Sequence, residues 1–171
     1  GRSLNAIAVH TPSRHMEPGS SALQAAAEAA LTAQGVQWTD LRELVFRVLA
    51  ETGEPSSAYA IAERVSTAAG RRIAANSVYR ILDLFVAHDV AKRVESRNAY
   101  VVNRHPSCRH DCIFLVCQGC TAIQHLDDDR LAHAMRNRAT DAGFRPTRAV
   151  LEILGWCADC EPKLHEDRTL P

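Results

Sequence analysis

The sequence predicts an α+β fold, with an N-terminal winged helix-turn-helix domain followed by a small α/β domain that carries a metal. Three observations support this prediction. Helix-patterned segments fill residues 21–87, two short β-prone segments follow them, and two Cys-x-x-Cys pairs lie in the second half of the chain. The change from helical to strand-like patterning near residue 90 therefore separates two structural units.

The first two helices are indicated by composition and by their end signals. Residues 21–34 are rich in alanine, and Gly35 follows them as a C-terminal cap. Thr39 is a predicted N-cap for the second helix, which ends at Gly53 and Pro55. Its apolar residues share one helical face: Leu41, Leu44, Val45, Val48 and Leu49.

The third and fourth helices complete a helix-turn-helix pattern. Ser56 or Ser57 is expected to cap the third, which ends at Gly70 and turns Tyr59, Ile61, Ala62 and Val65 inward. Asn76 is expected to cap the fourth, with a buried stripe formed by Val78, Ile81, Leu82 and Phe85.

A β-hairpin directly after the fourth helix is typical of a wing. Its predicted strands, 90–95 and 99–102, flank the turn 96–98. The basic residues Lys92, Arg93 and Arg97 are suited to a phosphate backbone. The alternative is that they are ordinary solvated surface charges.

The second half is predicted to be a β-β-α-β unit. Its strands are expected at 113–117, 122–126 and 149–154, with a helix at 127–141 closed by Gly143. Such a unit has few core residues and exposed strand edges. Zinc and dimerisation are the two expected sources of added stability.

The cysteine pairs predict a structural zinc site. Cys117 and Cys120 form one knuckle, Cys157 and Cys160 form the other, and 36 residues separate the two. Four thiolates complete a tetrahedral shell with no open position. Disulfides or redox cysteines are the alternative. Residues 1–20 show no signal-peptide pattern, so we expect a cytoplasmic protein, in which disulfides are rare.

Charge gives little support for a nucleic-acid partner. The net charge is zero, and residues 1–104 hold 12 of the 20 Lys and Arg against 10 of the 20 Asp and Glu. Nucleic-acid-binding domains are usually more basic. The sequence also contains no apolar run of the length that a membrane span requires.

Four segments of the chain resemble the ferric uptake regulator family, and within it the zinc uptake regulator branch. They are Asn76-Ser77-Val78-Tyr79-Arg80-Ile81-Leu82, Val94-Glu95-Ser96-Arg97-Asn98-Ala99-Tyr100, Phe114-Leu115-Val116-Cys117 with Cys120, and Gly155-Trp156-Cys157-Ala158-Asp159-Cys160. The resemblance implies a homodimer that binds operator DNA when it is loaded with metal.

The resemblance also implies a division of the chain. We expect a disordered arm at 1–20, a winged-helix DNA-binding domain at 21–103, a metal-binding linker at 104–112, a dimerisation and zinc-binding domain at 113–162, and a tail at 163–171. Asn76, Ser77, Tyr79 and Arg80 would lie at the start of the recognition helix. Arginine can form a bidentate contact with guanine, and tyrosine can pack on a thymine methyl group.

The expected sensing site departs from the family pattern. Lys92 and Asn103 stand where many relatives have a histidine and a cysteine, and neither is a normal zinc ligand. A nearby cluster offers other ligands for a regulatory zinc: His105, Cys108, His110, Cys112 and His125. Its cysteine content favours zinc over iron or manganese.

The sequence and the resemblance together predict a zinc-responsive repressor of zinc-uptake genes, with one structural and at least one regulatory zinc per chain. A relative that senses iron, manganese or peroxide is the nearer alternative. A zinc-dependent enzyme is more distant, because we find no catalytic motif of a metalloprotease, serine hydrolase or phosphate-binding loop. We expect no enzymatic activity, no membrane partner and no small organic substrate.

Overall fold

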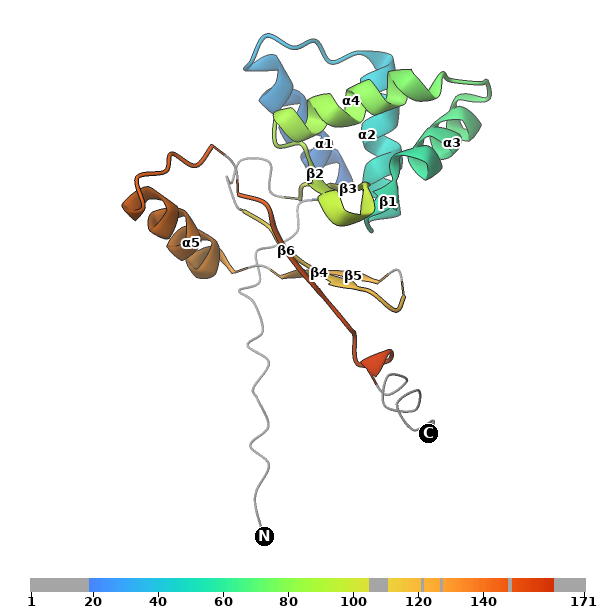
Figure 1. Ribbon diagram of the computed structural model, residues 1–171. Coiled ribbons are helices and arrows are strands. Elements are labelled where there is room, and N and C mark those ends of the chain that lie inside the picture. The colour runs from blue at the N-terminus through green and yellow to red at the C-terminus, as the bar shows by residue number, and fades with distance from the viewer. Residues whose placement is uncertain (1–18, 105–110, 121, 127, 148, 162–171) are drawn as a thin grey trace, which may run out of the picture.

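The described part of the chain forms two units, which lie one above the other in Figure 1. A computed structural model of the protein describes residues 19–104, 111–120, 122–126, 128–147 and 149–161. The upper unit contains helices α1 to α4 and a small sheet. The lower unit contains a second sheet and helix α5. This is the mixed architecture that the sequence predicts.

Helices α1 (Ser20–Thr32), α2 (Asp40–Thr52), α3 (Ala58–Ala69) and α4 (Ala75–Ala87) build the upper unit. Their ends follow the predicted signals. The hydroxyl of Thr39 accepts from the backbone N–H of Arg42 at 3.3 Å, and that of Ser57 accepts from Ala60 at 3.1 Å. After α1, Gly35 takes a left-handed conformation (φ 74°) while Val36 donates back to Leu31. These contacts satisfy the last carbonyls of α1.

Two predictions about these helices are wrong. Tyr59 is 63% exposed, because it lies on the outer side of α3 while Ile61, Ala62 and Val65 turn inward. Asn76 does not cap α4: the helix begins at Ala75, two residues earlier than predicted, and its N-cap, Ala74, makes no side-chain cap bond. Asn76 is thereby an exposed residue of the first helical turn.

The buried faces of the helices enclose one core. The stripe predicted for α4 is confirmed, because Val78, Ile81, Leu82 and Phe85 are each at most 7% exposed. Phe85 and Phe46 meet edge to face with ring centroids 6.3 Å apart, and Trp38 stacks on Phe85 at 6.2 Å. Aromatic pairs in these geometries add to the stabilisation from apolar burial.

The wing consists of β2 (Ala91–Val94) and β3 (Ala99–Val102), joined by a 3-10 turn at Glu95–Arg97 and by Asn98 in a left-handed conformation. This agrees with the predicted hairpin. A third strand, β1 (Ser56–Ser57), pairs with Ala99 and Tyr100 and gives the sheet order β1-β3-β2. We did not predict β1, since two residues are too few to show a strand pattern.

The lower sheet contains β4 (Ile113–Cys117), β5 (Ile123–Leu126) and β6 (Leu151–Gly155) in the order β5-β4-β6. β4 is antiparallel to β5 and parallel to β6. Helix α5 (Asp129–Asp141) forms the crossover between β5 and β6. The carboxylate of Asp128 caps it by accepting from Leu131 at 3.0 Å, so the helix begins two residues later than predicted.

The wing packs between α4 and the lower sheet (Figure 1). Val94 and Ala99 of the wing form a buried cluster with Phe114 and Val116 of β4. On the other side, the hydroxyl of Tyr100 donates to Asp83 of α4 at 2.8 Å. Burial is the largest cause that raises the pKa of Tyr100 to about 12, and the bond to Asp83 adds to it. The wing is therefore the bridge between the two units.

The corrected position of Tyr59 yields a stability prediction. Phe85→Ala should lower the free energy of unfolding of the upper unit by about 3–5 kcal/mol, because it empties a fully buried site. Tyr59→Ala should change the free energy of unfolding by at most about 0.5 kcal/mol, since its ring lies in solvent. Urea denaturation of both variants measures this. A large loss for Tyr59→Ala would contradict its exposed placement.

Candidate metal centre and nucleic-acid interface

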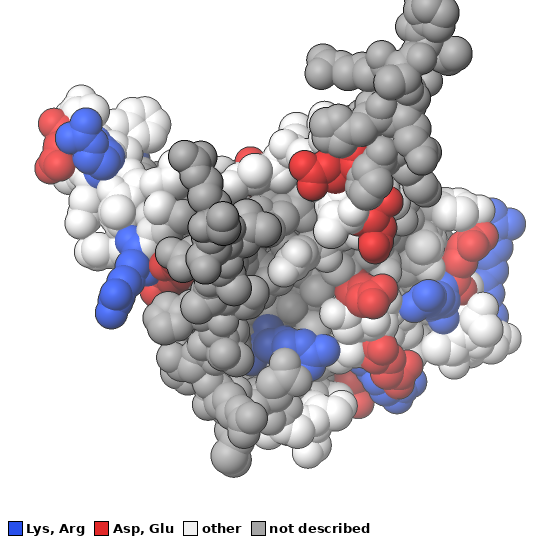
Figure 2. Space-filling view, turned by 90° about the horizontal axis from the view of Figure 1, so that it is seen from below, with Lys and Arg blue, Asp and Glu red and all other residues white. Residues whose placement is uncertain are grey.

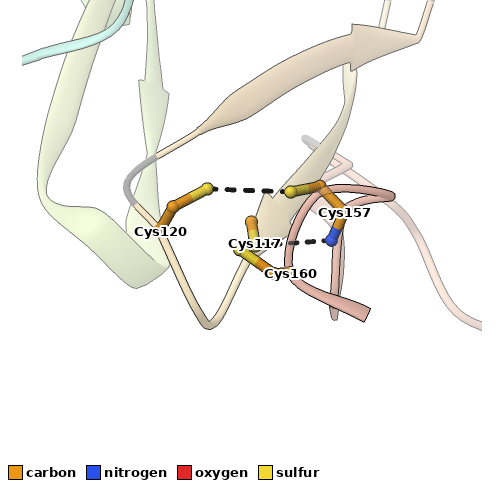
Figure 3. A group of neighbouring side chains, drawn as sticks. All are labelled: Cys117, Cys120, Cys157 and Cys160. Atoms are coloured by element: carbon orange, nitrogen blue, oxygen red, sulfur yellow. Dashed lines mark hydrogen bonds between the residues drawn. The ribbon is translucent and has the colours of Figure 1, made fainter. Parts of the chain in front are cut away.

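The parallel pairing of β4 and β6 brings the two cysteine knuckles together. Cys117 is the last residue of β4 and pairs with Gly155 at the end of β6, so the segments that follow both strands leave the sheet at the same edge. Cys120 comes from the turn after β4, and Cys157 and Cys160 come from the turn after β6. Figure 3 shows the four side chains converging.

The spacing of the four sulfurs fits one tetrahedral ion. All four Sγ atoms lie within 4.8 Å of one another, and those of Cys120 and Cys157 are 3.8 Å apart. Zinc–sulfur bonds of about 2.3 Å in a tetrahedral shell require sulfurs about 3.8 Å apart. Among the described residues, this is the one group of three or more His, Cys, Asp or Glu whose ligand atoms lie close enough for a common ion.

The electrostatics of the cluster favour a cation. The backbone N–H of Cys157 donates to the sulfur of Cys117 at 3.4 Å (Figure 3). The backbone N–H of Gly119 donates to the same sulfur at 3.4 Å. Backbone donors, with that of Cys157 the strongest, lower the pKa of Cys117 to about 6. The hydrogen bond with Cys157, followed by burial, raises the pKa of Cys160 to about 12. Four neighbouring thiols cannot all lose their protons easily, because the negative charges of the thiolates would repel one another. A bound cation would compensate that charge and favour the thiolate forms.

Trp156 packs directly on the first knuckle. A Cβ atom added at Gly119 would lie 2.7 Å from Cζ3 and 2.8 Å from Cε3 of its indole ring. Only glycine fits between Cys117 and Cys120 at this point. We did not predict this contact from the sequence, although Gly119 lies within the first knuckle and Trp156 directly precedes the second.

The first turn of α4 presents a polar surface. Asn76, Ser77 and Arg80 are exposed, whereas Tyr79 is half-buried against the helical core. Arg71 and Arg72, also exposed, precede this turn and were missed by the sequence reasoning. Their signal was a pair of adjacent arginines just before the fourth helix. Together these residues offer the donors that phosphate and base edges accept.

The basic residues of the wing already have partners within the protein. Lys92 pairs with Asp89 at 3.2 Å, and Arg93 donates to Asn98 at 2.7 Å. Arg97 donates to the backbone carbonyl of Cys117 at 2.6 Å. Their role in binding phosphate therefore stays a prediction, and Arg97 in particular is bound to the lower unit.

Lys92 and Asn103, the two residues that depart from the family pattern of metal ligands, both contact Asp89. The Nζ of Lys92 contacts the carboxylate of Asp89, and the amide of Asn103 donates to the backbone carbonyl of the same residue at 2.6 Å. Asp89 itself has a φ of 58° in the turn between α4 and β2. These two side chains therefore hold the turn that joins α4 to the wing.

Of the expected regulatory ligands, Cys112 and His125 are described, while His105, Cys108 and His110 lie outside the described residues. The ring of His125 packs on Phe114 at 5.6 Å, and Cys112 packs against the same cluster of wing and β4 residues. Cys112 also lines a cavity of about 360 Å³ between the units, together with Lys92, Arg93 and Arg136. The two described candidates thus lie near the junction of the units.

Charges of both signs are interspersed over the described part of the surface seen from below in Figure 2. This agrees with the net charge of zero. None of the described helices combines the length and apolar character needed to cross a membrane.

Comparisons of the sequence and of the structure with known proteins point to the same family. The model of the ferric uptake regulator family matches residues 33–154. The zinc uptake regulation protein of Escherichia coli is 27% identical over 139 residues, which cover 81% of each chain. A zinc uptake regulator complexed with zinc and DNA has a TM-score of 0.71 and 26% identity, and the match covers 86% of this chain and 99% of that one. A crystal structure of holo XcZur has a TM-score of 0.65 and 34% identity, with 81% and 96% covered.

The packing of Trp156 on Gly119 yields a prediction about the knuckle. Gly119→Ala should weaken zinc binding at the four cysteines about 10- to 100-fold, as changes that disturb supporting contacts of metal ligands do. Competition with a chromophoric chelator measures the affinity. Gly155→Ala is the control, because an added Cβ there meets nothing within 4 Å. Adding Trp156→Ala should restore binding to the Gly119→Ala variant, and a failure to do so would refute the steric explanation.

Proposed function

The chain belongs to the ferric uptake regulator family, and we propose that it is a zinc-responsive transcriptional regulator that represses zinc-uptake genes by binding their operators as a zinc-loaded homodimer. The observation that carries the proposal is the four-sulfur cluster, whose spacing suits zinc, in a chain that also has a winged-helix unit. The zinc regulators named above support the choice of zinc within the family.

Cys117, Cys120, Cys157 and Cys160 would hold the structural zinc. When bound, zinc supplies four bonds to thiolates and leaves no position for a substrate, which suits a structural role. The ion would join the ends of β4 and β6 in a unit that buries few apolar side chains. The bond from Cys157 to the Cys117 sulfur already orients one ligand pair.

Apolar side chains on the lower unit support a homodimer. Ile153 of β6 is 56% exposed, and α5 exposes Leu131 (45%) and Met135 (49%). Phe144, after α5, is 67% exposed. Monomeric proteins rarely leave so many large apolar side chains in solvent within one small unit. A second copy of the chain would cover them and would place two recognition helices on one operator.

The first turn of α4 would contact the bases. Arg80 is exposed there, and its guanidinium would form a bidentate contact with guanine, while Asn76 and Ser77 would bond to bases or phosphates. Tyr79 would contribute its hydroxyl from a ring that packs partly on the core. Lys92 and Arg93 of the wing would have to exchange their contacts with Asp89 and Asn98 in order to reach phosphate.

A regulatory zinc would bind at the junction of the units, where Cys112 and His125 lie. His105, Cys108 and His110 are the further candidates from the intervening segment. Ligands from the linker and from the lower sheet would fix the orientation of the DNA-binding unit in the dimer. A coupling of about 1–3 kcal/mol between zinc and DNA would be typical of such a device.

A sister regulator that senses iron, manganese or peroxide is the second candidate, since solved ferric and manganese uptake regulators share the fold at 18% identity. The sulfur-rich ligand set favours zinc over iron and manganese. Membership of a family of regulators also supports a role without catalysis. We place the protein in the cytoplasm, where its operator DNA would be.

The proposal predicts metal-dependent DNA binding. Zinc should raise the affinity of the purified homodimer for a zinc-uptake promoter about 5- to 150-fold, whereas iron(II) and manganese(II) at matched free concentrations should not. Mobility-shift titrations with buffered metals measure this. Equal or better activation by iron or manganese would assign the chain to the alternative.

The regulatory site is tested in the same assay. The double variant His110→Ala, His125→Ala should keep the structural zinc and the dimer but lose the gain in operator affinity on adding zinc. His133→Ala is the matched control, because His133 is exposed on α5. A wild-type zinc response in the double variant would exclude these two imidazoles as ligands.

Arg80 should carry base readout. Arg80→Ala should cost about 1–3 kcal/mol of operator binding with unchanged zinc content, because it removes a base contact and no metal ligand. Affinity for scrambled DNA should change much less, and Arg130→Ala, at an exposed position of α5, should change neither. Equal losses on operator and scrambled DNA would show that Arg80 contacts only phosphate.

A further inference from the structure

The turn of the wing makes two polar contacts with the lower sheet, beside the apolar cluster described above. The carboxylate of Glu152, on β6, accepts from the backbone N–H of Glu95 at 2.5 Å and from that of Ser96 at 3.1 Å. The guanidinium of Arg97 donates to the carbonyl of Cys117 at 2.6 Å. In the first contact a side chain of the sheet binds the wing backbone. In the second contact a side chain of the wing binds the sheet backbone.

The sheet register explains why these groups meet. Phe114 pairs with His125 on one side and with Glu152 on the other, so the three side chains lie in one row across the sheet on the face that meets the wing. Glu152 accepts two backbone donors of a turn instead of pairing with a mobile Lys or Arg. Hydrogen bonds to a charged acceptor are stronger than neutral ones and depend on position.

We propose that Arg97 and Glu152 are positioning residues that latch the wing to the lower sheet and thereby set the orientation of the recognition helix. The wing latch consists of these two side chains, the N–H groups of Glu95 and Ser96, and the Cys117 carbonyl. The wing in turn holds α4 through the bond from Tyr100 to Asp83. Helix α4, the wing and the sheet therefore form one connected series of contacts.

The latch also joins the DNA-binding unit to the four-cysteine centre. The acceptor of Arg97 is the carbonyl of a residue whose sulfur belongs to that centre, and the backbone of Cys117 is held by β4 pairing with β6. Disorder of the knuckle after loss of its metal would move this carbonyl. Through the latch, the four-cysteine site would affect the position of the wing. This effect would not require the regulatory ligands.

The latched arrangement should favour DNA binding; this step rests on the proposed function. The relative bound to zinc and DNA matches 86% of this chain, a share that neither unit could supply alone. The match has a TM-score of 0.71 over that length, which supports a similar arrangement of the two units. Opening the latch should accordingly weaken operator binding.

The decisive experiment separates a latch from a phosphate contact. Zinc-loaded Arg97→Ala and Glu152→Ala should each weaken operator binding about 5- to 100-fold, and the double variant should lose no more than the worse single variant, because both open one latch. The slope of log affinity against log salt should stay at its wild-type value. A phosphate contact by Arg97 would instead flatten that slope by about one unit and leave Glu152→Ala at wild-type affinity. Either of these results would overturn the proposal.

Control variants exclude a general loss of structure. Glu152→Gln retains an oxygen acceptor and should keep more of the affinity than Glu152→Ala. Glu161→Ala and Arg130→Ala, exposed residues of the lower unit, should bind as the wild type does. All variants should retain wild-type zinc content and dimer mass. Additive losses in the double variant, at full zinc content, would show that the two residues act independently and would refute the latch.

A second measurement needs no DNA and so separates failure of the latch from failure of the proposed function. Hydrogen exchange at the amides of Glu95 and Ser96 should become at least about ten-fold faster in Glu152→Ala, because their acceptor is lost. Chelating the metal of the wild-type protein should speed the same amides. Unchanged exchange in Glu152→Ala would overturn the latch even if the wild type binds its operator. Faster exchange in a protein that binds no operator would support the latch and refute the proposed function.

Discussion

The lower unit depends on the parallel pairing of β4 with β6. This pairing joins segments separated by an antiparallel strand and a crossover helix, and it aligns Cys117 with Gly155. Two knuckles that are 36 residues apart in sequence therefore leave the sheet at one edge. Without this register the four sulfurs would not lie within 4.8 Å of one another. A bound ion would in turn hold the register, so that strand pairing and metal binding stabilise each other.

The wing has a second structural role besides the one suggested by its position in a DNA-binding motif. It is buried between α4 and the lower sheet, with Val94 fully inaccessible and Ala99 nearly so. Its turn donates to Glu152, while Arg97 donates to Cys117. Because these contacts lie on the side opposite to the bond between Tyr100 and Asp83, the wing connects the sheet to α4, and a shift of the sheet would move that helix.

The placement of individual charged side chains says more about nucleic-acid binding in this protein than its net charge does. Composition argued against a nucleic-acid partner, since acidic and basic residues balance. In the structure, many of the charged groups of the wing and junction neutralise one another, as in the pairs of Lys92 with Asp89 and Arg136 with Asp111. The exposed arginines near α4, Arg71, Arg72 and Arg80, are a small share of the total charge. A regulator of this kind would rely on a few placed donors more than on a broad positive field.

The sequence by itself determined the elements and the candidate metal ligands that carry local signals. Thr39 and Ser57 cap helices because a hydroxyl beside free N–H groups acts within one turn, and the apolar stripe of α4 follows from helical period alone. The spacing within each knuckle likewise identified Cys117, Cys120, Cys157 and Cys160 as one ligand set. The burial predicted for Tyr59 was wrong because local sequence does not show which face of α3 the rest of the protein covers. The cap predicted at Asn76 was wrong because a residue that favours an N-cap can also lie in the first turn of a helix. Only the tertiary structure decided that β1 joins the wing, that Trp156 covers Gly119, and that Arg97 and Glu152 connect the two units. Each of these contacts joins residues 20 or more positions apart, and partners so distant in sequence are set by packing and strand register.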